Sequence, residues 1–278
     1  MGFSDSRTNF AEIVGRLGED LDLLRASLYI ADEDCGGINF EQIYGELNVL
    51  AVAASDYMRP SAAFPANIKS LSKFLSVVQG FTGNLDKYYL ADNIYFHKVL
   101  DKKKGIPISL SLIYMEVGKR LGIYFEPIGL PGHMLIKGTQ GSDQIYLDPF
   151  NHGKILTKDE CYELFDKMFG GKVVLTEQSF KVTTKREFLV RQLLNLINVH
   201  MKSNNYIQAL AAIDRIELVI PTDGQNFKDR SKVFRAVGKY SRAIYELECY
   251  LKLRPLPLDE KAIRRKIREL WAIIAALN

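Results

Sequence analysis

Apolar residues recur every three or four positions in the first part of the chain, which is the spacing of an amphipathic helix. The pattern extends from about residue 8 to residue 80 and includes Leu17, Leu21, Leu24 and Leu28, followed by Ile43, Leu47 and Leu50. Residues at positions i, i+3, i+4 and i+7 share one face of a helix. We therefore expect an N-terminal layer of helices over this range.

The spacing of apolar residues changes between residues 105 and 150. Pro107 begins a stretch with one apolar helical face that ends at Gly122, and proline suits the first helical position because its missing N–H costs nothing there. Strand-like segments follow at 124–130, 133–137 and 144–148, separated by Pro131-Gly132 and by a turn-rich stretch at 138–143. A helix followed by consecutive strands predicts an α+β domain with a small antiparallel sheet.

From about residue 185 the chain is helical again and contains a repeat. Tyr206 and Tyr240 are 34 residues apart, and the same offset relates Ala209 to Ala243. Thirty-four residues is the tetratricopeptide period, in which a small residue stands where two helices cross. The resemblance to tetratricopeptide repeats covers about 190–257, and a final helix at about 258–276 would cap them. We expect these four residues to lie at helix–helix contacts; the alternative is two helical hairpins that are alike by accident.

The turn between the last two strand-like segments predicts a contact between a histidine and an aspartate. If the turn is centred between Gln140 and Gly141, opposing residues have numbers that sum to 281, and His133 faces Asp148. Directly opposed residues have Cβ atoms about 5 Å apart on one face of the sheet. An imidazole held by a carboxylate forms two-thirds of a nucleophilic triad. The third member would sit best at a helix N-terminus, such as the one near Pro107.

Short motifs surround this pair. In chain order they are Gly83-Asn84, Asp92-Asn93, Lys104-Gly105-Ile106-Pro107-Ile108-Ser109-Leu110, Gly129-Leu130-Pro131-Gly132-His133 and Leu147-Asp148-Pro149-Phe150. Together they resemble the SirB-type branch of the transglutaminase-like superfamily, in which tetratricopeptide repeats often follow the core. The resemblance implies a transglutaminase-like (papain-like) α+β domain over 1–180, with the helical layer at about 8–80 and the core at about 81–180. A helical repeat module would follow over 185–278.

The resemblance also implies a departure from the catalytic pattern. Catalytic transglutaminase-like cores begin their central helix with Gly-x-Cys, and its closing glycine comes 17 residues after the first. Gly105 and Gly122 have that separation, and the cysteine position falls on Pro107. His133 and Asp148 would then be the vestige of a triad. Ser109 is a candidate substitute nucleophile, although a shift of two residues turns it about 200° around the helix. Candidate residues lining the former cleft are Asn84, Asn93 and Gly132.

Two functions from different classes follow. The favoured one is a non-catalytic transglutaminase-like protein that binds a protein or peptide through its helical repeats, its former active-site cleft, or both. The alternative is an enzyme, a hydrolase or acyl-transferase of amide or peptide bonds, in which His133 and Asp148 act with a substitute nucleophile such as Ser109. Neither function needs a cofactor.

The cysteines do not predict a metal site. Cys35, Cys161 and Cys249 are far apart and form no Cys-x-x-Cys or Cys/His ligand spacing. We interpret Cys35 and Cys161, which lie outside the motifs, as small buried hydrophobic residues. We expect the protein to hold no metal.

Composition narrows the class of protein. The 278 residues are 47% hydrophobic and 25% charged, which is ordinary for a globular protein, and the net charge of +4 is far below that of a dedicated nucleic-acid binder. The longest apolar run, near residues 47–54, is much too short to cross a bilayer. We expect a cytoplasmic protein that does not bind nucleic acid and has no segment that spans a membrane.

Overall fold

The computed structural model describes residues 3–15, 21–59, 62–141, 143–172, 174–221, 224–253 and 258–277. Leu17 of the predicted helical layer lies outside these ranges. The chain divides into two compact units, Met1–Gln192 and Leu193–Asn278, so that the division falls within helix α8 (Lys185–Lys202). Each unit is described separately below.

The first unit begins with a layer of helices. They are α1 (Phe3–Gly15), α2 (Leu23–Cys35), α3 (Phe40–Ser55) and α4 (Phe64–Lys73), which continues into a π-helical segment at Phe74–Val78. Asp22 and Asn39 accept hydrogen bonds from backbone N–H groups in the first turns of α2 and α3. These polar residues begin the helices because they satisfy donors that have no partner within the helix.

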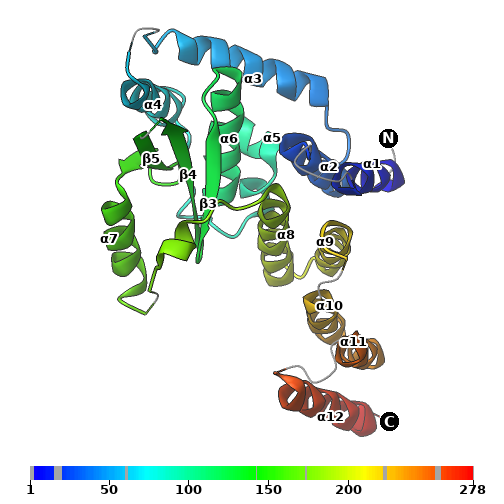
Figure 1. Ribbon diagram of the computed structural model, residues 1–278. Helices are drawn as coiled ribbons and strands as arrows, with labels where there is room; N and C mark the ends of the chain where they lie inside the picture. Colours follow the sequence, from blue (N-terminus) through cyan, green and yellow to red (C-terminus); the bar gives the residue numbers. More distant parts are fainter. Residues whose placement is uncertain are drawn as a thin grey trace. The chain divides into compact units, whose positions relative to one another are not determined.

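The core places a central helix against an antiparallel sheet. Helix α5 (Phe96–Lys102) and the short parallel pair β1 (Thr82–Gly83) and β2 (Lys104–Gly105) precede the central helix α6 (Pro107–Arg120). The sheet has the order β3 (Phe125–Leu130), β4 (His133–Gln140), β5 (Asp143–Asp148), β6 (Lys154–Leu156). Helix α7 (Lys158–Phe169) and a 3-10 turn at Glu177–Phe180 follow, and Figure 1 shows the sheet between α6 and α7. The prediction of an α+β fold is confirmed.

The predicted register of the β4–β5 hairpin is wrong by two residues. Lys137 pairs with Tyr146 and Gln140 pairs with Asp143, so the opposing numbers sum to 283. The prediction placed Gly138 in the turn, but this glycine lies inside β4, where a Cβ would approach Ile68 Cδ1 at 2.8 Å. Close packing requires glycine here, whereas Gly141, with a φ of +59°, belongs to the turn. A slip of two residues leaves every side chain on its predicted face, because successive side chains along a strand alternate between the two faces of the sheet.

Within its described ranges, the regular secondary structure of the second unit consists of helices. After the end of α8 come α9 (Tyr206–Val219), α10 (Gln225–Ala236), α11 (Tyr240–Leu253) and α12 (Glu260–Leu277). Ala209 and Ala243 are fully buried, whereas Tyr206 and Tyr240 are half-buried. Helices α10, α11 and α12 share one apolar core, built from Phe234, Ala243, Ile244, Leu247, Tyr250, Ile263 and Leu270.

Candidate functional site

The histidine and the aspartate singled out in the sequence form a buried hydrogen bond. His133 is the first residue of β4, Asp148 is the last residue of β5, and His133 Nε2 lies 2.9 Å from Asp148 Oδ2. The side chains are 2% and 0% exposed. Asn151 adds two donors to the carboxylate, its backbone N–H to Oδ1 at 3.2 Å and its Nδ2 to Oδ2 at 2.7 Å. The carboxylate is therefore satisfied by protein groups, as burial requires.

Two aromatic rings enclose the imidazole. The ring centroids of Phe150 and Phe165 lie 6.0 Å and 6.3 Å from that of His133, in edge-to-face geometry. Phe165 comes from α7, and its core cluster includes Leu135, which shares the His133 face of β4 by alternation. Within the described residues, the imidazole makes its side-chain hydrogen bond with Asp148, and no hydroxyl or thiol makes one with it. The pair thus lies in a mainly aromatic environment.

Phe150 also connects the imidazole to the start of the central helix. The backbone N–H of Gly83 donates to the carbonyl of Phe150 at 3.0 Å, and a Cβ at Gly83 would come within 2.6 Å of the Phe150 ring. Gly83 in turn pairs with Gly105, two residues before Pro107. Glycine is needed at position 83 because the ring occupies the place of a side chain.

The first turn of α6 contains Pro107, at the position of the catalytic cysteine in the resemblance, and Ser109, the candidate substitute nucleophile. Pro107 is the first helical residue and is buried. The Ser109 hydroxyl accepts a hydrogen bond from the N–H of Ile106 at 3.1 Å and lies 2.5 Å from the carbonyl of Asn93, to which it donates. A serine hydroxyl has one proton to donate. Ser109 therefore serves as a helix cap, which joins α6 to the segment that precedes α5.

Asn84 and Asn93 hold that preceding segment together. Asn84 Nδ2 donates to Asn93 Oδ1 at 2.9 Å, and Asn93 Nδ2 donates to the carbonyl of Lys87 at 2.6 Å. The backbone N–H of Asn84 also donates to the carbonyl of Gly105 at 3.0 Å. Asn93 is 3% exposed. Their amides thus fold the loop at 84–93 onto the strand that precedes α6.

An arginine holds the turn that precedes His133. Gly132 is exposed with a φ of +67° after Pro131, the arrangement typical of a type II turn. Arg191 Nη2, from α8, donates to the carbonyls of Leu130 and His133 at 2.6 Å and 2.9 Å. Burial lowers the pKa of Arg191 from its ordinary value. Gly132 therefore acts in the turn, and Arg191 joins the ends of β3 and β4.

The cysteines differ in their surroundings. Cys161 is buried beside the site, and burial together with the nearby Asp148 charge raises the pKa of its thiol to about 12. Cys35 is exposed, which corrects its interpretation as a buried residue: it ends α2 and is followed by the positive-φ pair Gly36 and Gly37. In the described part of the chain, no three His, Cys, Asp or Glu side chains are grouped as a metal site would require. None of the described helices has the combined length and apolar character needed to cross a bilayer.

Four residues of this site were not among the site candidates predicted from the sequence. Phe150, Phe165, Asn151 and Arg191 surround or hold the His133–Asp148 pair. Phe150 ends the Leu147-Asp148-Pro149-Phe150 motif and Asn151 follows it directly, so a search for donors close to the aspartate could have found Asn151. Phe165 and Arg191 come from helices far along the chain, and only the tertiary fold brings them to the site.

Comparison with known proteins places this architecture in a family. The chain is 29% identical over 259 residues to a UPF0162 protein of Xylella fastidiosa, covering 91% of each chain. A UPF0162 protein of Pseudomonas aeruginosa is 26% identical over 89% of this chain and 90% of its own. Mouse F-box only protein 21 is 37% identical over 127 residues, which are 43% of this chain and 19% of that protein. The family model described as the transglutaminase-like superfamily matches residues 41–194. This match spans more than half of the sequence, and the chain belongs to the transglutaminase-like superfamily.

Proposed function

We propose that this protein is a non-catalytic transglutaminase-like protein of the SirB type that acts in the cytoplasm as a scaffold for a protein or peptide partner. The observation that carries the proposal is the start of α6. Pro107 occupies the cysteine position of the catalytic pattern, and Ser109, the candidate substitute, uses its hydroxyl as a helix cap. A His–Asp pair without a nucleophile cannot form a covalent acyl intermediate.

The burial of the pair supports the same proposal. His133 and Asp148 are almost fully enclosed, and Phe150 and Phe165 pack against the imidazole. A general base must come within hydrogen-bonding reach of the group that it deprotonates. An imidazole enclosed in this way favours a structural role, in which the pair stabilises the ends of β4 and β5. The former active-site region would then act as a binding surface.

We further propose that the C-terminal unit is a tetratricopeptide-like array and that it supplies the main binding surface. Helices α9 and α11 begin at Tyr206 and Tyr240, and the fully buried Ala209 and Ala243 occupy the same position in each. Arrays of stacked helical pairs present extended surfaces to partners. The boundary between this array and the transglutaminase-like domain would lie near residues 180–185, at the start of α8.

The alternative function is hydrolysis or acyl transfer at amide or peptide bonds by His133, Asp148 and Ser109. The hydrogen bonds of the Ser109 hydroxyl to Ile106 and Asn93 weigh against it. A test would compare the tagged full chain with its Ala243→Glu variant, which disrupts the C-terminal helices, in affinity purification from cell extract. We expect the full chain to retain a partner that the variant loses, and we expect neither chain to release amine from peptide amides. If the full chain hydrolysed peptide amides and Ser109→Ala abolished that activity, the alternative enzymatic function would be established instead.

A further inference from the structure

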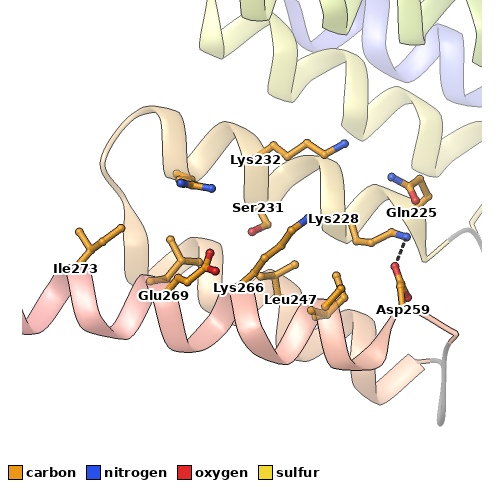
Figure 2. Close-up of a pocket in the computed structure, with 13 residues that line it drawn as sticks. Gln225, Lys228, Ser231, Lys232, Leu247, Asp259, Lys266, Glu269 and Ile273 are labelled. Carbon is orange, nitrogen blue, oxygen red and sulfur yellow. Dashed lines mark hydrogen bonds and ion pairs between the residues drawn. The ribbon is translucent and has the colours of Figure 1, made fainter.

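The helices of the C-terminal unit enclose a groove with an apolar floor and a basic rim. The groove has a volume of about 210 Å³ and lies between α10 and α12. Figure 2 shows side chains of both helices directed into it, with Leu247 of α11 at its base. Leu247, Ile263 and Leu270 line the groove with exposures of 3%, 2% and 3%, and the half-buried Ile273 lines it beside them, so the floor is apolar.

The rim carries more positive than negative charge. Lys228, Lys232, Arg235 and Lys266 line the groove together with two carboxylates, Asp259 and Glu269, which leaves a net charge of +2. Lys228 forms an ion pair with Asp259 at 3.0 Å, and Lys232 forms one with Asp229 at 2.6 Å. The remaining carboxylate, Glu269, lies 3.7 Å from Arg265.

Two of these cations form no ion pair with a residue that the structure describes. In the ranges that the structure covers, no carboxylate forms an ion pair with Arg235 or Lys266, and neither side chain makes a hydrogen bond. Both residues are exposed, and Lys266 extends from α12 toward α10 in Figure 2. The groove therefore offers two cations from opposite walls above an apolar floor.

We propose that this groove binds an acidic peptide segment of a protein partner, which seats a bulky apolar side chain on the floor and places carboxylates against Arg235 and Lys266. The inference rests on the scaffold function proposed above and names the chemistry of its partner. The volume of the groove favours a peptide side chain over a cofactor, since small-molecule sites usually have volumes of about 300–1,000 Å³. The charge of the rim selects acidic over basic segments, because like charges across an interface are unfavourable.

The test is a fluorescence-anisotropy titration of the full chain with a fluorescein-labelled peptide of three Glu-Glu-Leu units. We expect saturable binding that weakens as salt is added, because screening reduces the attraction between exposed charges. Two matched probes separate the contributions. A peptide of Lys-Lys-Leu units should not bind, and a peptide of Glu-Glu-Ser units should bind at least about fivefold more weakly, because it lacks the apolar side chain.

Charge-reversal variants locate the site. Lys266→Glu and Arg235→Glu should each weaken binding at least about fivefold, whereas Arg268→Glu should change it less than about twofold. Arg268 is exposed on the same helix but does not line the groove. Its reversal changes the net charge of the protein by the same amount, which makes it the matched control. Unchanged melting temperatures would show that the variants fold.

Three results of the binding measurements would overturn the proposal that the groove binds an acidic peptide. They are absence of saturable binding up to about 1 mM protein, equal losses in Lys266→Glu and Arg268→Glu, and tighter binding of a single-stranded oligonucleotide than of the peptide. Equal retention of a cellular partner by Lys266→Glu and by the parent would also overturn it while leaving the scaffold proposal intact. Failure of the parent to retain any partner would count against the scaffold proposal alone.

Discussion

His133 and Asp148 form a hydrogen bond of 2.9 Å although they are diagonal rather than direct neighbours in the β4–β5 hairpin. Ile136 pairs with Leu147 in the observed register. Extending this register by one residue places Asp148 opposite Leu135. Residues on one face of a strand are two apart, so His133 and Leu135 share the face of Asp148. A diagonal contact of this kind lies within reach of an imidazole and a carboxylate.

We predict that His133→Ala lowers the free energy of unfolding by about 1–3 kcal/mol, because it removes one donor from a fully buried carboxylate. Urea denaturation followed by circular dichroism would measure the change. The matched control is His152→Asn, an exposed loop residue with a φ of +56° that asparagine tolerates, for which we expect a change within about 0.5 kcal/mol. Equal stabilities of parent and His133→Ala would contradict the structural role of the pair.

We predict that Ser109→Ala lowers the free energy of unfolding by about 1–2 kcal/mol, because it removes two hydrogen bonds of a buried hydroxyl, each with a net value of about 0.5–1.5 kcal/mol. Its hydroxyl caps α6 through the N–H of Ile106 and binds the carbonyl of Asn93. Ser55→Ala is the control, because the Ser55 hydroxyl is exposed and donates to the carbonyl of Val52 at the end of α3. If the two variants were equally stable, the Ser109 hydroxyl would be available for another role.

We predict that Ala243→Glu lowers the free energy of unfolding of the C-terminal unit by at least about 3 kcal/mol, because it places a charge in a seam with no exposed surface. Thermal melting followed by circular dichroism would detect the loss. Ala272→Glu makes the same substitution at an exposed position of α12, and it should melt within a few degrees of the parent. Similar melting of both variants would mean that residue 243 is not a packing position.

We predict that Pro107→Cys introduces a thiol that reacts with iodoacetamide faster than Cys161. A cysteine at the first residue of α6 would lie at the positive end of the helix dipole, which favours the thiolate. The raised pKa of Cys161, about 12, leaves that thiol protonated below this pH. Peptide mass spectrometry after labelling at pH 8 would compare the two rates in one sample. A slower reaction at position 107 would show that its burial outweighs the dipole and that the match to the catalytic cysteine is wrong.

The local features of the fold could be predicted from the sequence. The helical spacing in the N-terminal layer, Pro107 at the first position of α6 and the three strand-like segments each depend on neighbouring residues. The contact of His133 with Asp148 was predicted even though the register was not, because alternation depends only on whether a slip is even or odd.

The tertiary structure alone decided which partners complete the site. Gly138 has the local signal of a turn, yet it lies in a strand because Ile68 packs where its side chain would be. Phe165 and Arg191 reach His133 from α7 and α8, and no spacing in the sequence relates them to it. Local sequence determines backbone preference and the facing of side chains. Contacts between distant elements depend on how their surfaces fit together, and here that fit encloses the imidazole between Phe150 and Phe165.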